Sequence, residues 1–441
     1  MKDLTTGHEG KSILLFTLPM LIGALFQQLY NTADSIIVGQ FIGKDAMAAV
    51  SGANPIMFLL TSLLTGITLG FSILVSQYYG SRSMDKVKST IDTTYIFVFI
   101  SSLIITILGI ALCEPILKAM NTPQEILYSS KIYLIIIFAG TIFSAGYNSI
   151  SAILRGLGDS KNPLYFLIIA TILNIILDII FIIYLNMGIS GAALATVIAQ
   201  GVSFIFSIIY LNKKHKLINI KIKEMKFNNK IFNKGLRLGI PSAIQQMLFS
   251  FGNIALQSLV NSYGASAMAA FGAGLRIESF ISLPIINLGA AVSTFVAQNK
   301  GAKKFDRIHK GIKYSVYISI ILAVTVAFLF VFLSKELIMM FNSDTDVLEI
   351  GSRYLNTIGP FFIFICISFM LTSAIKGAGN AIFPLISSII SLWLARIPGS
   401  YFFSNLIGVN GIWLGIPIGW IIGFFITLIY YKKANWQKEI I

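Results

Sequence analysis

The chain has 441 residues, of which 56% are hydrophobic and only 12% are charged, and its formal net charge is +15. Soluble globular domains contain about 25% charged residues, so this chain has too few charges to cover a water-soluble surface. A water-soluble enzyme is therefore excluded. Runs that are apolar throughout, such as YLIIIFAGTIF, also argue against a membrane β-barrel, whose strands alternate polar and apolar residues.

Twelve apolar runs are long enough to cross a bilayer, so the sequence predicts an all-α integral membrane protein with twelve transmembrane helices. In chain order, they are expected at residues 13–38, 47–77, 90–112, 130–153, 163–185, 188–211, 238–260, 267–297, 312–333, 353–375, 383–403 and 409–431. The longest polar connection follows the sixth helix. We therefore predict an N-terminal six-helix lobe (1–211), a cytoplasmic basic linker (212–236) and a C-terminal six-helix lobe (237–441) with a short cytoplasmic tail.

Basic residues lie mostly on one side of the predicted membrane. With both termini cytoplasmic, 26 of the 33 Lys and Arg residues fall in inner segments and five in outer segments. This bias follows the positive-inside rule and predicts a multi-pass protein of the cell membrane with both termini in the cytoplasm. The positive charge is then explained by the anionic inner leaflet of the lipid bilayer and not by nucleic acid.

The two halves of the chain match at a shift of 221 residues. GKDAMAAV, which begins at Gly43, returns as GASAMAAF from Gly264, and ILRGLGDSKNPL returns as AIKGAGNAIFPL. Each half has an even number of predicted helices, so both repeats enter the membrane from the same side and are parallel. Two parallel repeats around a central cavity predict a transporter that works by alternating access.

Polar side chains inside predicted spans are candidates for function, because they are costly in a bilayer. In the first helix, Gln27, Asn31 and Asp34 are spaced i, i+4 and i+7, so they share one face. Tyr30 lies beside them. We expect Gln27, Tyr30 and Asn31 to line the substrate cavity.

Asp34 is also the first of four residues predicted to bind a coupling cation or proton. Asn174 and Asp178 share a face of the fifth helix at i, i+4, and Thr196 lies on the sixth. At a rise of about 1.5 Å per residue, all four fall in the outer half of the membrane and can meet in one site. Two carboxylates with amide and hydroxyl oxygens suit Na⁺, by analogy with other hard cations, and the carboxylates also suit a proton.

The second lobe lacks this acidic pair. Its first helix instead carries a neutral polar stripe formed by Gln246, Ser250, Asn253 and Gln257. The stripe either lines the substrate cavity or makes hydrogen bonds between helices. On the next helix, Arg276 and Glu278 are two residues apart and do not face each other. Arg396 is the candidate partner of Glu278, so these three residues are predicted to form a charge network, with either a structural or a transport role.

At these residues, the chain resembles the multidrug and toxic compound extrusion (MATE) family over its whole length. The resemblance is carried by LPMLIGALFQQLYNTADSIIVGQFIG, by RGLGDSKNP after the fourth helix and by the Asn174-xxx-Asp178 pair. Family members export cationic or amphipathic drugs and toxins in exchange for Na⁺ or H⁺. The resemblance implies that Asp34, Asn174, Asp178 and Thr196 form the cation or proton site, and that Glu278 matches a common family acid.

Family members with a second acidic site carry carboxylates on helices 7 and 10, and this sequence has none there. We therefore expect coupling in the N-terminal lobe, no cofactor besides the transported Na⁺ or H⁺, and a monomer.

Two alternatives remain open. A flippase for a lipid-linked precursor, from a related superfamily, would hold its anionic headgroup with several basic residues, whereas only Arg276 and Arg396 are basic in the interior of the predicted spans, away from their ends. A membrane-embedded enzyme would need a catalytic motif, but the sequence has no HExxH or GxSxG. We therefore predict a transporter and not an enzyme.

Overall fold

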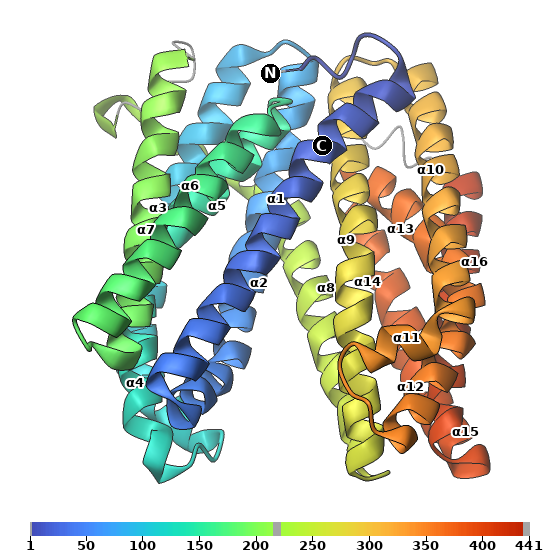
Figure 1. The fold of residues 1–441 in the computed structure, drawn as a ribbon. Coiled ribbons are helices and arrows are strands. Elements are labelled where there is room, and N and C mark those ends of the chain that lie inside the picture. Colours follow the sequence, from blue (N-terminus) through green and yellow to red (C-terminus); the bar gives the residue numbers. More distant parts are fainter. Residues whose placement is uncertain (1, 215–221, 435–441) are drawn as a thin grey trace. The chain divides into compact units, whose positions relative to one another are not determined.

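The computed structural model describes residues 2–214 and 222–434, and every regular element in these ranges is helical (Figure 1). The prediction of an all-α membrane protein is confirmed. The first half contains α1 (Glu9–Ile37), η1 (Val38–Ile42), α2 (Lys44–Gly80), α3 (Met84–Ala119), α4 (Gln124–Ala139), α5 (Thr141–Gly156), α6 (Lys161–Asp178), η2 (Ile179–Tyr184) and α7 (Gly188–Lys214). Residues 215–221 of the predicted linker and the tail beyond residue 434 lie outside the described residues.

The second half follows the same order of long helices. It contains η3 (Ile222–Glu224), α8 (Asn229–Asn261), α9 (Ala265–Gly301), α10 (Phe305–Phe332), α11 (Ser334–Met339), α12 (Thr345–Ile358), η4 (Gly359–Phe361), α13 (Phe362–Gly377), α14 (Ile382–Ser388), η5 (Ile389–Arg396), α15 (Ile397–Ile407) and α16 (Val409–Lys433). Three of the segments marked η, namely η1, η2 and η5, are π-helical.

Within the described ranges, ten helical spans are long and apolar enough to cross a membrane. Helices α4 and α5 form an eleventh span that is bent by 50°. The predicted seventh helix corresponds to α8, whose 33 residues extend for about 50 Å. This helix is long enough to cross but is not among the apolar spans, because its sequence carries a polar start and several amide side chains. Polar side chains within a membrane helix usually face the interior of the helix bundle or a water-filled cavity.

The chain divides into two compact units. The first unit comprises Met1–Asp3 with Leu18–Leu236, and the second comprises Leu4–Thr17 with Arg237–Ile441. The first two turns of α1 therefore belong to the second unit, and the first two turns of α8 belong to the first. Each unit thus includes the start of a helix whose remainder lies in the other.

Hydrogen bonds explain why residues 4–17 belong to the second unit. The Leu4 backbone N–H donates to Oε1 of Gln298 over 3.1 Å. The guanidinium of Arg307 donates to the carbonyl oxygen of Gly7 over 2.7 Å and pairs with Glu9 over 3.2 Å. Charge-assisted bonds of this kind are about twice as strong as neutral ones, so the polar end of α9 and α10 fixes the start of the chain.

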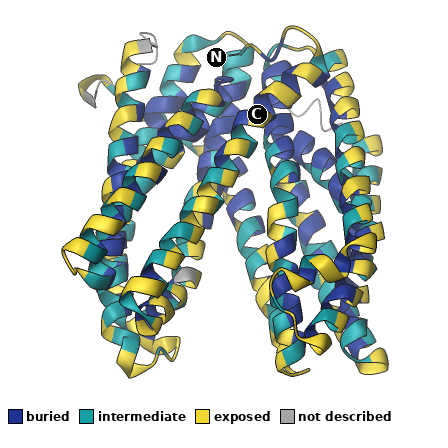
Figure 2. Cartoon of the chain, in the orientation of Figure 1, coloured by how far each residue is buried: buried dark blue, intermediate teal, exposed yellow. Residues whose placement is uncertain are grey.

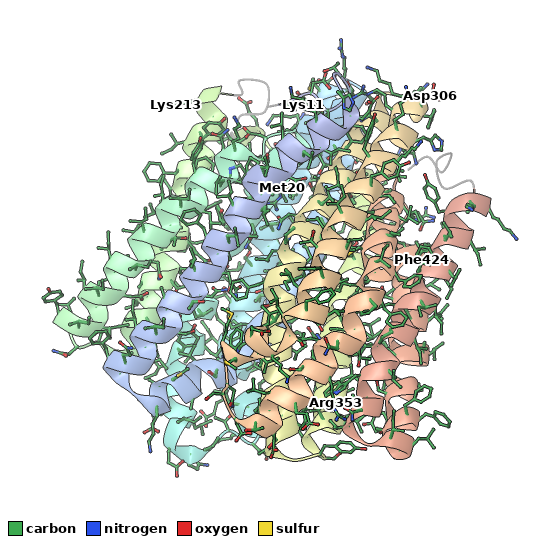
Figure 3. All side chains as sticks on the ribbon, turned by 45° about the vertical axis from the view of Figure 1, so that its right-hand side comes forward. Lys11, Met20, Lys213, Asp306, Arg353 and Phe424 are labelled. Carbon is green, nitrogen blue, oxygen red and sulfur yellow. The ribbon has the colours of Figure 1, made fainter. Side chains whose placement is uncertain are left out.

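Figure 3 marks the two ends of the second unit, with Lys11 and Asp306 at one end and Arg353 at the other. With both termini cytoplasmic, the predicted spans leave Lys11 and Asp306 in inner segments and put Arg353 at the outer end of the span 353–375. The second unit therefore presents the predicted inner and outer segments at opposite ends.

Small residues and lipid-facing side chains show how the first unit packs. A Cβ on Gly146 of α5 would overlap the ring of Phe204 of α7, so glycine permits close approach of these helices. On α3, Phe99, Ile107 and Leu108 are 56%, 59% and 52% exposed. Figure 2 shows exposed stripes of this kind alternating with buried stripes along the helices. Large apolar side chains on the outside are stable in contact with lipid tails, which have no tendency to exclude them.

Candidate functional site

Two acidic residues in the first unit each precede a π-helical segment. Asp34 lies on α1 four residues before η1, and Asp178 is the last residue of α6, directly before η2. Such widened turns are frequent at functional sites. The Oδ1 atoms of both residues are buried and have no hydrogen-bond partner among the described residues.

Asn174, Asp178 and Thr196 are brought together by the packing of α6 against α7. When the Asn174 side chain is oriented so that both its amide nitrogen and its amide oxygen have hydrogen-bond partners, the nitrogen donates to Oδ2 of Asp178 over 3.0 Å. The amide oxygen then accepts from the Thr196 backbone N–H over 3.2 Å. Asn174 and Asp178 are fully buried. Asn174 therefore orients Asp178 and ties it to α7.

Helix α1 adds two members to this cluster. The hydroxyls of Tyr30 and Thr196 are hydrogen-bonded over 3.1 Å, and the carboxylate of Asp34 interacts electrostatically with that of Asp178. The structure therefore gathers Asp34, Asn174, Asp178 and Thr196, which the sequence predicted as one site, and it places Tyr30 with them. We call these five residues the acidic cluster.

Sequence reasoning missed Tyr133 of α4, which interacts electrostatically with both Asp34 and Asp178. A signal for it was present in the duplication. At the shift of 221 residues, the pair Tyr133-Leu134 matches Tyr354-Leu355. A tyrosine repeated at the same place in both halves of an apolar chain would have drawn attention to this position.

The acidic cluster is suited to binding a small cation. It offers two carboxylates, an amide and hydroxyls, which are the oxygen ligands that hard cations prefer. Within residues 2–214 and 222–434, no group of three or more His, Cys, Asp or Glu side chains is placed to hold a metal ion. A cation here would therefore be shared by two carboxylates and neutral oxygens, which suits Na⁺ or a proton better than a transition metal.

The other predicted residues of α1 lie on its exposed side. Gln27 donates through Nε2 to Oδ1 of Asn31 over 3.5 Å, and both side chains are exposed. They form no part of the hydrogen-bonded acidic cluster, and they remain available to other polar groups.

On α8, the predicted polar stripe is largely accessible. Gln246, Ser250 and Gln257 are half-buried and Asn253 is exposed. Gln257 donates to Oδ1 of Asn261 on the same helix over 2.8 Å.

The neighbouring Gln245, which sequence reasoning did not single out, ties α8 to α14. Its Nε2 atom donates to Oγ of Ser388 over 2.6 Å and to the carbonyl oxygen of Pro384 over 3.1 Å. Adjacent residues point about 100° apart on a helix, so Gln245 joins the two helices while Gln246 is left on the accessible side.

The predicted charge network in the second unit is assembled in part. Glu278 of α9 accepts a hydrogen bond from the Tyr354 hydroxyl and interacts electrostatically with Arg396. Tyr354, which sequence reasoning missed, lies on α12. Arg276 is exposed on α9.

The chain is similar to a known protein family in sequence and in fold. The family model described as MatE matches residues 19–180 and again residues 241–402, which reproduces the duplication. The chain is 33% identical to the probable multidrug resistance protein YpnP of Bacillus subtilis, over 99% of this chain and 97% of that protein. It is 31% identical to the probable multidrug resistance protein YoeA of the same organism, over 97% and 94%. A solved outward-facing multidrug resistance MATE family transporter is similar at a TM-score of 0.91 and 25% identity, over 98% of this chain and 97% of that one.

Proposed function

This chain belongs to the MATE family of membrane transporters, which confirms the resemblance seen in its sequence, and on that premise we propose that it is a cation-coupled antiporter. It exports amphipathic or cationic small molecules, including drugs and toxins, in exchange for Na⁺ or H⁺. It works in the cell membrane with both termini in the cytoplasm, because 26 of its 33 basic residues then lie on the inner side. It acts as a monomer and needs no cofactor besides the transported ion.

One observation carries the coupling proposal, namely the unbalanced negative charge of the acidic cluster. Asp34 and Asp178 interact with each other, and within the described residues no ion pair joins either of them to Lys or Arg. Uncompensated charge inside a membrane is costly. Binding of Na⁺ or protons relieves this cost, so the cluster has a physical reason to be loaded by a cation.

Loading the cluster can drive export because it changes the preference of the protein for its conformational states. A cation that binds one state more tightly than another shifts the equilibrium between them, and the drug must prefer the opposite state or compete with the cation. Each elementary charge that crosses a potential of about 100 mV contributes about 2.3 kcal/mol. Asp34 and Asp178 bind the cation, Asn174 orients Asp178, and Thr196 supplies a further oxygen.

The substrate class is inferred from the accessible neutral groups and from the relatives. Gln246, Ser250, Asn253 and Gln257 on α8 offer hydrogen-bond donors and acceptors without a charge, as do Gln27 and Asn31 on α1. Such groups recognise varied molecules when apolar and methionine side chains surround them, because these re-pack easily. YpnP and YoeA, which carry the name of multidrug resistance proteins, support the same substrate class.

The proposal is tested with the purified protein in liposomes. Efflux of a fluorescent cationic drug is measured under an imposed Na⁺ gradient, under an imposed pH gradient, and without either. We expect one of the two gradients to drive export against the drug gradient. Equal rates under all three conditions would contradict cation coupling, while the protein would remain a transporter if it still equilibrates the drug.

A further inference from the structure

The surroundings of the acidic cluster are apolar on one side and polar on the other. The apolar side lies toward the connections from α1 to α2 and from α6 to α7. One helical turn beyond Asp34, Asp178 and Thr196 in this direction, the neighbours on the same helix faces are Val38, Ile182 and Ala192. The first two follow their acids by four residues, whereas the third precedes its threonine by four, because α7 runs back along α6.

These three neighbours belong to one buried apolar cluster of the first unit. Val38, Ile182 and Ala192 are 1%, 5% and 1% exposed, and they cluster with Ala46 and Ala49 of α2. The π-helical segments η1 and η2, which supply the first two, contact each other. We call these five residues the apolar seal.

In the opposite direction, the same three helix faces stay polar. One turn from the acids and the threonine on this side lie Tyr30, Asn174 and Gln200. The first two are members of the acidic cluster. Gln200, which sequence reasoning missed, is half-buried on α7. On α1 the polar face continues to Gln27, whose side chain is exposed.

This polarity determines how a cation can reach the cluster. To cross the apolar seal, a cation would lose its water in a layer that offers no side-chain oxygen, which is costly. On the other side, amide and hydroxyl oxygens can replace that water. Asp34 is half-buried, whereas Asp178 has no exposed surface, so an arriving cation contacts Asp34 first.

We propose that the transported cation enters and leaves the acidic cluster from the side of Gln200, and that the apolar seal closes the opposite end. This inference rests on the cation site proposed above. With both termini in the cytoplasm, the closed end is the outer one. The cluster then does not open directly to the outer water, and Gln200 is the first side chain of α7 that an approaching cation meets.

Access to the cluster can be measured without transport, on the purified full-length protein in detergent. Thr196→Cys is introduced in a background in which Cys113 and Cys366, both buried, are replaced by Ala. The probe is methanethiosulfonate ethylammonium, a small cation that labels thiols, and the readout is the rate of labelling. Gln200→Leu should slow labelling by about tenfold, because the approaching cation loses a hydrogen-bonding group.

The matched control makes the same chemical change on the other side of the seal. Gln40 is exposed in η1, two residues beyond Val38, and Gln40→Leu should leave the labelling rate unchanged. Any result in which Gln200→Leu lowers the rate no more than Gln40→Leu does would overturn the proposed route.

Opening the seal should create the route that it blocks. In the Gln200→Leu background, Val38→Ala leaves a space one turn beyond Asp34, and the labelling rate should recover several-fold. If this variant fails to fold, Val38→Thr keeps the size of the side chain and adds an oxygen. Ile36→Thr, at a residue of α1 that is 51% exposed, is the matched control and should restore nothing. No recovery with either variant of Val38 would show that the seal does not close this end.

The labelling rate does not depend on ion coupling, so the two proposals fail in different ways. If neither a Na⁺ nor a pH gradient drives export but Gln200→Leu still slows labelling, the coupling proposal is wrong and the route to the cluster is confirmed. If a gradient drives export and Gln200→Leu leaves labelling unchanged, the coupling proposal stands and the route is wrong.

Discussion

Replacing Asp178 by Asn removes a negative charge from the acidic cluster while leaving the geometry of the cluster nearly unchanged. Asparagine has nearly the same size, and its amide oxygen can still accept the 3.0 Å hydrogen bond from Asn174. Asp34→Asn is equally conservative, because Oδ1 of Asp34 has no partner to lose among the described residues. We therefore expect both variants to fold and to insert into the membrane, with the negative charge of the cluster halved.

The loss of one carboxylate removes at most one transported charge. At about 100 mV that charge contributes about 2.3 kcal/mol, and about 1.4 kcal/mol corresponds to a tenfold ratio. The drug gradient that the protein can maintain should therefore fall by about 50-fold for each cation no longer coupled. The measurement is the steady-state ratio of drug concentrations across the liposome membrane, under the gradient that drives the wild type together with an imposed membrane potential of about 100 mV.

A matched control separates this effect from a general change in charge. Asp45 is exposed at the start of α2, so Asp45→Asn removes one negative charge outside the cluster and should leave the ratio unchanged. An Asp178→Asn protein that folds and still maintains the wild-type drug ratio would show that Asp178 is not a coupling residue. The same outcome for Asp34→Asn would remove Asp34 from the mechanism.

Three further predictions test other parts of the molecule. Gln246→Ala should change the apparent affinity for some drugs by several-fold while the ion dependence stays intact, and loss of ion dependence in transport assays would refute its role in substrate contact. Gly274→Ala should destabilise the second unit by about 1–3 kcal/mol because its Cβ overlaps a buried ring, whereas Gly272→Ala, with no atom within 4 Å of its Cβ, should melt like the wild type. Single cysteines introduced at Lys213 and Lys335 should differ in their accessibility from outside intact cells. Only the second should react with an impermeant thiol reagent, and labelling of the first would overturn the assigned orientation.

Much of the fold followed from the sequence because helix length and apolarity are local properties. The proposed coupling residues could also be found. Asn174 and Asp178 are four residues apart and so share one face of a helix, and Asp34 is an acidic residue within an apolar run, where acidic residues are rare. The π-helical segments could not, because one widened turn leaves no periodic signal in a short stretch. The 50° bend between α4 and α5 was missed as well, since both helices belong to one continuous apolar run.

The functional residues that the sequence did not reveal were missed for one physical reason. Tyr133 matters because it interacts electrostatically with acids from two other helices, and only tertiary packing brings α4 near them. Gln245 and Gln246 cannot be distinguished by composition, yet packing makes one a link to Ser388 and leaves the other accessible. Polar residues in a membrane chain are easy to find, but their roles depend on which neighbouring helix they face.

The number of carboxylates in the acidic cluster has a consequence for energy coupling. If coupling is confined to the first unit, only the two carboxylates of the acidic cluster can carry ions. Exchange of one cation for one monovalent cationic drug moves no net charge, so the membrane potential cannot drive it. Loading of both Asp34 and Asp178 leaves one net inward charge per cycle, which contributes about 2.3 kcal/mol at 100 mV. The second carboxylate is therefore what would make export of a cationic drug respond to voltage, and this explains why two acids are gathered where one would suffice to bind an ion.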